Sequence, residues 1–229
     1  MNANNTHKQI HCKAYMKKAI YFLVSMICLL LPVAGRAQSM LYVSNLLQTA
    51  VGSEPVGSDS WLAGYFETGT NAGGYILNSV QLLMNAGSGT PSGFTVSVYS
   101  STNIGPGSRL GDLGGSDPLA GGLFTYTNSG IAMTPSTYYS VVVNAATPVA
   151  QGAYSWSAVF GSSNRSNDGW IIGAGYYSSA DGSSWQFSRD KTFQMAIYAT
   201  AIPEPDVLGL LGLGGLAFVW HRRKATRFF

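Results

Sequence analysis

The stretch Phe94-Thr-Val-Ser-Val-Tyr-Ser100 decides the fold class of this chain. Val96 and Val98 stand two residues apart with a polar residue between them, so both side chains point to the same face of an extended strand. The segment Thr137–Val143 has a similar pattern and is rich in β-branched residues, which pack well on a pleated sheet. Both segments are therefore predicted to be β-strands with one buried face.

Similar runs recur between residues 41 and 200, and clusters of Gly, Ser, Asn and Pro separate them. The predicted strands are 41–46, 61–67, 75–84, 94–100, 122–127, 137–144, 154–160, 169–177 and 193–200. The clusters at 86–93 and 105–107 are predicted to be turns. No stretch in this part has helical periodicity, so we predict an all-β domain: a single antiparallel β-sandwich with a jelly-roll-like strand order.

Beyond this region the chain has a three-part tail. The triplet Pro203-Glu204-Pro205 precedes an uncharged apolar run, Val207–Trp220. As a helix that run would span about 21 Å, which is short against a hydrocarbon core of about 30 Å. A basic cluster follows, made of Arg222, Arg223, Lys224 and Arg227. By the positive-inside rule, this cluster places the C-terminal end of the chain in the cytoplasm.

The order of these three parts resembles the PEP-CTERM sorting signal of Gram-negative bacteria. The resemblance implies that Pro203, Glu204 and Pro205 form the sorting motif, that the helix anchors the protein transiently, and that a membrane-embedded exosortase processes it. It also implies export to the cell surface or extracellular matrix. The alternative is a permanent tail anchor with a chance Pro-Glu-Pro triplet.

The N-terminal part predicts export independently. Lys17 and Lys18 precede an apolar run, Ala19–Leu31, and small residues follow at the positions read by signal peptidase, with cleavage after Ala37. Met16 is an alternative start of the chain; an uncleaved anchor is the alternative reading. The sequence thus divides into a signal peptide with its helix (1–37), an exported β-sandwich (38–201) and the sorting signal (202–229).

The exported segment differs in composition from the whole chain. Residues 38–201 contain neither Cys nor His, so no disulfide forms within them. They hold four basic and eight acidic residues, a net charge of −4, whereas the whole chain has +3. An acidic domain without a basic stripe is not suited to neutralise phosphates, so no nucleic-acid partner is expected.

Several segments of the exported part resemble the choice-of-anchor surface proteins, most closely type R. They include Pro55-Val-Gly-Ser-Asp-Ser-Trp-Leu-Ala63, Gly73-Gly-Tyr-Ile-Leu-Asn-Ser-Val80 and Pro91-Ser-Gly-Phe-Thr-Val-Ser-Val-Tyr-Ser100. The resemblance covers residues 41–200. It implies a secreted β-domain whose relatives carry different C-terminal anchors, and it supplies no catalytic or binding residues.

The residues give little support for catalysis. Without His or Cys the usual nucleophile–base pairs are missing, and Lys191 is the only lysine for a Ser–Lys dyad. Glu54, Asp59 and Glu67 are the nearest carboxylates for glycoside hydrolysis, but their positions resemble ordinary surface sites. We therefore expect no enzyme activity, and a secreted hydrolase is the least favoured alternative.

Aromatic residues give a stronger functional signal. Trp156 and Trp170 lie in apolar strands, where a role in the core is the simpler interpretation. Trp185 lies in a predicted loop, and Tyr176 and Tyr177 place one ring on each face of a strand. Exposed rings of this kind stack on sugars. Trp185, Tyr176 and Tyr177 are therefore candidate glycan-binding residues, with extracellular polysaccharide as the partner.

Metal binding has weaker support. Oxygen ligands for calcium occur in loops at Asp112, Asp117, Asp168 and Asp181, but none has the spacing of a calcium loop. No cofactor or metal site is predicted, and a structural calcium ion stays an alternative. The sequence as a whole favours a non-catalytic surface or matrix protein, with a glycan-binding module as the second reading.

Overall fold

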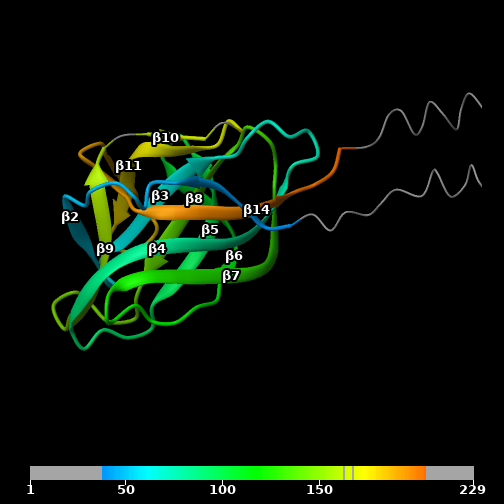
Figure 1. The fold of residues 1–229 in the computed structure, drawn as a ribbon. Helices are drawn as coiled ribbons and strands as arrows, with labels where there is room; N and C mark the ends of the chain where they lie inside the picture. The colour runs from blue at the N-terminus through cyan, green and yellow to red at the C-terminus, as the bar shows by residue number, and fades with distance from the viewer. Residues whose placement is uncertain (1–37, 162, 167, 205–229) are drawn as a thin grey trace, which may run out of the picture. The chain divides into compact units, whose positions relative to one another are not determined.

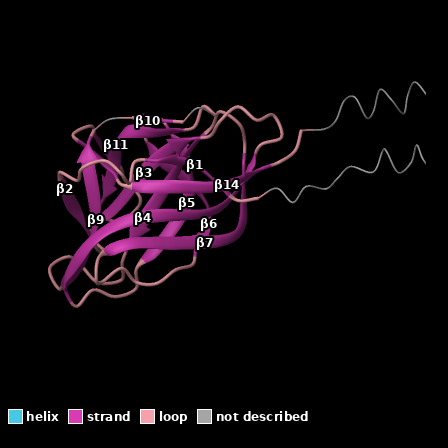
Figure 2. Cartoon of the chain, in the orientation of Figure 1, coloured by secondary structure: helices cyan, strands magenta, loops and turns pink. Residues whose placement is uncertain are grey.

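The computed structural model describes residues 38–161, 163–166 and 168–204. The predicted signal peptide with Ala37, both predicted terminal helices, Pro205 and the basic cluster lie outside these residues. The described part of the chain consists of strands and loops (Figure 2). Within it, no helix has the length and hydropathy that crossing a membrane requires.

The strands are numbered in chain order (Figure 1). They are β1 (Met40–Ser44), β2 (Gly52–Val56), β3 (Trp61–Glu67), β4 (Tyr75–Gly89), β5 (Thr95–Thr102), β6 (Gly105–Leu113), β7 (Gly122–Met133), β8 (Tyr138–Asn144), β9 (Gly152–Phe160), β10 (Asn164–Arg165), β11 (Ile171–Ser179), β12 (Gln186–Ser188), β13 (Lys191–Phe193) and β14 (Met195–Ala201).

These strands form two antiparallel seven-stranded sheets. The first sheet has the order β1-β14-β4-β9-β13, with β2 paired to β9 and β7 paired to β4. The second sheet has the order β10-β11-β3-β8-β5-β6, with β12 paired to β11. The two sheets pack face to face (Figure 1), so the predicted all-β sandwich is confirmed.

The strand order is that of a jelly roll with an insertion. Leu82 of β4 pairs with Met195 of β14 on one edge and with Phe124 of β7 on the other, which gives the order β1-β14-β4-β7. The facing four strands run β3-β8-β5-β6. The chain alternates between these two sets as in a double Greek key. The insertion is the segment between β8 and β14. Its strand β9 pairs with β4 and extends the first sheet, and its strand β11 pairs with β3 and extends the second sheet.

The core lies between the sheets. Val96 and Val98 of β5 are both buried in it, as their spacing predicted. Trp156 is fully buried, stacks on Phe193 with ring centroids 4.3 Å apart, and its Nε1 donates to the Gln194 carbonyl at 3.1 Å. Trp170 is also fully buried. The predicted core role of both tryptophans is confirmed.

Two predicted turns are partly strand. The cluster at 86–93 begins inside β4, which continues to Gly89 and pairs Ser88 with Ala153 of β9. The cluster at 105–107 opens β6, the edge strand of the second sheet, where Pro106 is tolerated because one edge of the strand lacks a partner. Residues typical of turns therefore led to turn predictions at positions that belong to the ends or edges of the sheets.

Candidate functional site

The outer face of the second sheet is partly covered. Ala63 and Val142 are fully buried although both lie outside the core cluster. The loop between β11 and β12 reaches the β5–β6 hairpin: a Cβ atom added to Gly105 would lie 2.7 Å from the Trp185 Cβ. Three strands, β3, β8 and β5, lie between β11 and β6 in this sheet. The β11–β12 loop and the β5–β6 hairpin can therefore meet only by crossing over these strands on the outer side of the sheet.

An open groove of about 360 Å³ lies on this outer side, and we call it the outer groove. It is lined by Tyr65, Ser101, Thr102, Asn103, Tyr138, Tyr177, Phe187 and Arg189. The rings come from four neighbouring strands, β8, β3, β11 and β12. Ser101, Thr102 and Asn103 come from the end of the β5–β6 hairpin, and Arg189 lies between β12 and β13. Aromatic surface with a few polar groups at its margin is the composition of ligand-binding pockets.

Tyr65 forms the centre of this surface. Its ring lies 6.3 Å from Tyr138, 5.9 Å from Tyr177 and 6.1 Å from Phe187, measured between ring centroids. The ring rests on the backbone of Gly173, and its hydroxyl donates to the Ala174 carbonyl at 2.9 Å. The ring is thus held by its contact with Gly173 and by the hydrogen bond of its hydroxyl group, which makes it a rigid platform.

Phe187 is fixed in a similar way. It lies opposite Tyr177 in the β11–β12 register, with ring centroids 4.9 Å apart. Its ring covers Gly175, whose φ of +113° and close contact both exclude a side chain. The Arg189 guanidinium lies 5.7 Å from the centre of the Phe187 ring, within cation–π range.

The groove presents hydrogen-bond donors at neutral pH. Burial raises the pKa of Tyr65 and that of Tyr177, and a hydrogen bond with Glu67 raises the pKa of Tyr138. Since Tyr65 already donates to Ala174 and Tyr138 to Glu67, the Tyr177 hydroxyl is the phenol of this groove that can donate to a ligand. The ion pairs within the described part of the chain join Arg109 to Asp112 and Lys191 to Glu54. Arg189 takes part in neither, so its charge is free to face a ligand.

The structure separates the predicted aromatic residues. Tyr177 lines the outer groove, whereas Tyr176 packs on the core side, 4.8 Å from the Phe193 ring. Trp185 is partly buried against Gly105 and does not line the groove. The sequence analysis missed Tyr65, Tyr138, Phe187 and Arg189. Tyr65 and Tyr138 could have been found, because both lie in predicted strands at alternate positions whose side chains point away from the core.

The carboxylates considered for hydrolysis do not form one site. Asp59 and Glu67 flank the whole length of β3, which spans roughly 20 Å, whereas paired glycosidase carboxylates lie about 5–9.5 Å apart. Glu54 belongs to the first sheet and is paired with Lys191. That hydrogen bond raises the pKa of Lys191, which opposes a role as a general base.

Three of the four aspartates considered for calcium already accept hydrogen bonds within the protein. Asp112 accepts from Ser97, Asp117 from Tyr154 at 3.0 Å, and Asp181 caps the Ser183 N–H at 2.8 Å. The residues the structure describes include no group of three or more His, Cys, Asp or Glu placed to bind one metal ion.

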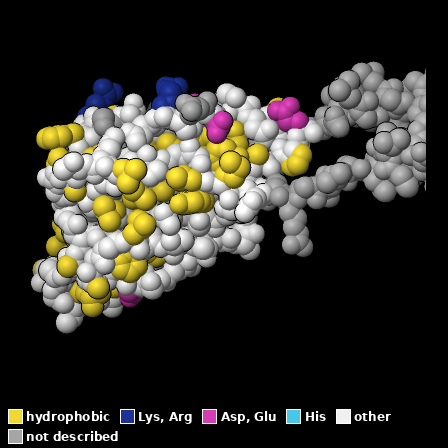
Figure 3. Space-filling model, in the orientation of Figure 1, with side chains coloured by type: hydrophobic (Ala, Val, Ile, Leu, Met, Phe, Trp, Pro, Cys, Tyr) yellow, Lys and Arg dark blue, Asp and Glu magenta, His cyan; other side chains and the backbone are white. Residues whose placement is uncertain are grey.

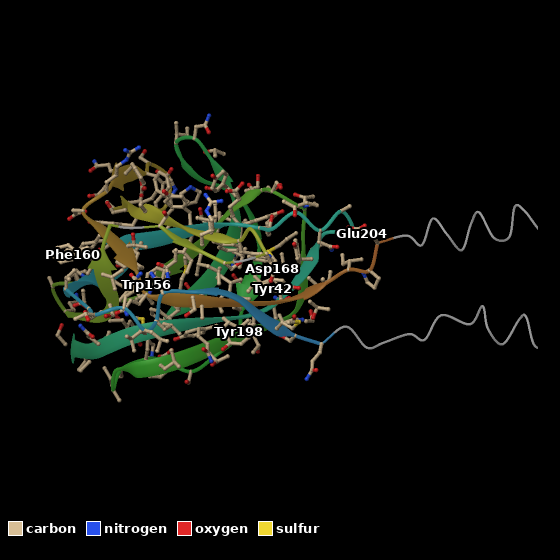
Figure 4. All side chains as sticks on the ribbon, turned by 45° about the horizontal axis from the view of Figure 1, so that its top comes forward. Tyr42, Trp156, Phe160, Asp168, Tyr198 and Glu204 are labelled. Atoms are coloured by element: carbon tan, nitrogen blue, oxygen red, sulfur yellow. The ribbon has the colours of Figure 1, made fainter. Side chains whose placement is uncertain are left out.

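Asp168 lies beside Tyr42 at the end of the sandwich from which the chain continues to Glu204 (Figure 4). Both line an open hollow of about 660 Å³ together with Met40, Thr70, Asn71, Tyr75, Gly169 and Ala201. Near this hollow, the turn Asn71–Gly74 contacts the start of the Pro-Glu-Pro triplet: the Ala72 N–H donates to Glu204 Oε1 at 3.1 Å.

The face formed by β14, β4 and β7 is different in character from the outer groove. On the side shown in Figure 3, hydrophobic atoms are scattered among uncharged polar ones, and charged side chains are few. It gathers no aromatic cluster comparable with that around Tyr65 among the ring contacts of the described residues.

One comparison with known proteins is informative. The family model for the PEP-CTERM protein-sorting motif matches residues 201–224, which include the Pro-Glu-Pro triplet, the apolar run and the basic residues Arg222, Arg223 and Lys224. No curated protein matches the chain. The chain therefore carries a PEP-CTERM sorting motif, and it is an exported protein that is anchored transiently through its C-terminal segment and processed by an exosortase.

Proposed function

We propose that this exported protein is a non-catalytic component of the cell surface or extracellular matrix, and that its outer groove binds the glycan chains of the extracellular polysaccharide. One observation carries the proposal: Tyr65, Tyr138, Tyr177 and Phe187 form a partly exposed aromatic surface that lines one groove, and Gly173 and Gly175 fix the rings of Tyr65 and Phe187. Rigid aromatic rings contribute contact area at a low cost in conformational entropy.

The groove has the features that sugar recognition requires. The apolar faces of sugar rings can lie on the aromatic surface, while the Tyr177 phenol and the residues Ser101–Asn103 meet hydroxyl groups at its margin. Its volume of about 360 Å³ is at the small end of the range for ligand pockets, which fits one or two sugar units of a longer chain. Arg189 adds a positive charge, which favours a polysaccharide that contains acidic sugars.

Affinity electrophoresis tests this proposal. The purified protein is run through gels with and without the polysaccharide of its host, and Phe187→Ala is compared with Phe160→Ala. Both phenylalanines are exposed, by 43% and 74%, but Phe160 ends β9 in the first sheet (Figure 4) and lies outside the groove.

We expect Phe187→Ala to weaken retention about tenfold and Phe160→Ala to leave it unchanged. Equal retention of both variants and the wild-type protein would show that the outer groove does not bind the polysaccharide. In that case the surface role would have to rest on other parts of the molecule.

A further inference from the structure

The turn Asn71–Gly74 holds the first residues of the sorting motif. The Ile202 N–H donates to the Gly74 carbonyl at 3.0 Å, so this segment briefly continues the pairing of β14. The Asn71 side-chain amide donates to the Ile202 carbonyl at 2.9 Å and to the Gly74 carbonyl at 2.6 Å. The Glu204 carboxylate accepts from the Ala72 N–H.

This close approach depends on glycine. A Cβ atom at Gly73 would lie 2.3 Å from the Ile202 carbonyl oxygen and 3.1 Å from that of Pro203. Gly74 has a φ of +78°, which is the left-handed region that other residues rarely adopt. The sequence Asn-Ala-Gly-Gly therefore forms a flat surface against which residues 202–204 can lie.

The arrangement also fits the chemistry of the motif. Pro203 has no N–H and cannot extend a ladder of backbone hydrogen bonds. The segment is held instead on either side of Pro203. The Asn71 side chain binds the Ile202 carbonyl before the proline, and the Ala72 N–H binds the Glu204 carboxylate after it. Pro203 and Glu204 both remain exposed while they are held. Because β14 ends at Ala201, only one residue separates the sandwich from the motif.

We propose that the Asn71–Gly74 turn is a positioning element for exosortase processing. It holds Pro203 and Glu204 extended and exposed, so the enzyme meets a substrate that is already ordered. A preordered segment loses less conformational entropy on binding than a free tail, and it therefore binds more tightly. The turn acts on recognition of the motif and not on the bond-breaking step.

The test is a kinetic comparison of full-length chains in membrane vesicles that contain the exosortase. Processing is measured by the decrease in mass of the substrate as its concentration is varied. Asn71→Ala removes the hydrogen bond to the Ile202 carbonyl and the hydrogen bond to the Gly74 carbonyl within the turn, and we expect KM to rise about fivefold with kcat unchanged. Gly73→Ala, which forces residues 202–203 away, should have the same effect.

Asn128→Ala is the matched control. The Asn128 side chain also forms hydrogen bonds, to the Asp112 carbonyl of β6 and from the Gly130 N–H within β7, but neither involves the Asn71–Gly74 turn or residues 202–204. This variant should keep the wild-type KM. The unfolding temperature of each variant, measured in parallel, separates a loss of fold from a loss of positioning. An unchanged or lower KM for both Asn71→Ala and Gly73→Ala would overturn the proposal.

Discussion

The ring of Tyr65 lies directly against the backbone of Gly173: a Cβ atom at position 173 would be 1.9 Å from Tyr65 Cε2. Gly173 belongs to the irregular part of β11, where the register with β3 shifts between Ile172 and Tyr176. Bulges of this kind re-aim side chains, and here the missing side chain makes room for a ring from the neighbouring strand. The aromatic surface thus depends on a glycine as much as on its tyrosines.

Gly173→Ala should disrupt the outer groove. The added methyl group must displace Tyr65, so we expect the free energy of unfolding to fall by about 1–3 kcal/mol and polysaccharide retention to weaken. Denaturant unfolding and affinity electrophoresis measure the two effects. Gly114→Ala is the control, because its nearest neighbour, the Thr127 carbonyl oxygen, would be 3.9 Å away. If Gly173→Ala behaved like Gly114→Ala, the packing described for Tyr65 would be wrong.

Arg189→Gln should make binding less sensitive to salt. The substitution removes the charge beside Phe187 and keeps a polar side chain. We expect retention on an acidic polysaccharide to fall, and the remaining binding to respond less to sodium chloride, because ions screen exposed charges. Arg109→Gln on β6, which is paired with Asp112 and does not line the groove, should keep the wild-type salt response. The same salt response in all three proteins would exclude Arg189 from binding.

Trp156→Ala should cause a large loss of stability. The indole is fully buried, stacks on Phe193 and donates to the Gln194 carbonyl. Removing it leaves a cavity and an acceptor without its partner, so the free energy of unfolding should fall by about 3–5 kcal/mol. Trp61→Ala, at a partly exposed position, should cost less in the same urea titration. A cost for Trp156→Ala below that for Trp61→Ala would contradict this core.

The protein should lose stability above about pH 10, in part through Tyr154. Burial, with a hydrogen bond to Asp117, raises the pKa of Tyr154 to about 12. An unfolded tyrosine has a pKa of about 10. Below about pH 10 both states keep the proton; between about pH 10 and 12 only the unfolded state releases it, so unfolding becomes more favourable.

Tyr154→Phe tests this pH dependence. The variant lacks the hydrogen bond to Asp117 and should be less stable at pH 8, but its unfolding temperature should fall less steeply from pH 10 to 12. The pKa of Tyr126 is also raised by burial, so part of the alkaline loss remains in the variant. Parallel curves for the two proteins would show that Tyr154 does not contribute.

The strands predicted best lie in the middle of a sheet, although the prediction of one buried face was wrong for 137–143, since Tyr139–Val143 of β8 are all buried because the outer face is partly covered. β3 was predicted with its observed bounds, 61–67, and β8 within one residue, because both strands lie in the middle of a sheet. The short strands β10 and β12 were missed, and so were the longer strands β2 and β6. β2 and β6 carry Pro55 and Pro106 and pair along one edge only, so little of their sequence is constrained by a core.

The outer groove was only partly predictable. Tyr177 was identified because alternate residues of a strand point to opposite faces. The sequence does not say which strands are neighbours, however, and the aromatic cluster forms because β11, β3 and β8 pair in that order. Trp185 was a candidate because of its loop, yet its neighbour is Gly105. The turn Asn71–Gly74 shows the same limit, since 131 residues separate Asn71 from Ile202.

The most direct test of the proposed function is an NMR titration of the isotope-labelled protein with oligosaccharides from its host's extracellular polysaccharide. We predict chemical-shift changes that concentrate at Tyr65, Tyr138, Tyr177, Phe187 and Arg189 and leave β14, β4 and β7 unchanged. Shifts confined to the first sheet, or no shifts at saturating oligosaccharide, would contradict the assignment of the outer groove as a glycan-binding site.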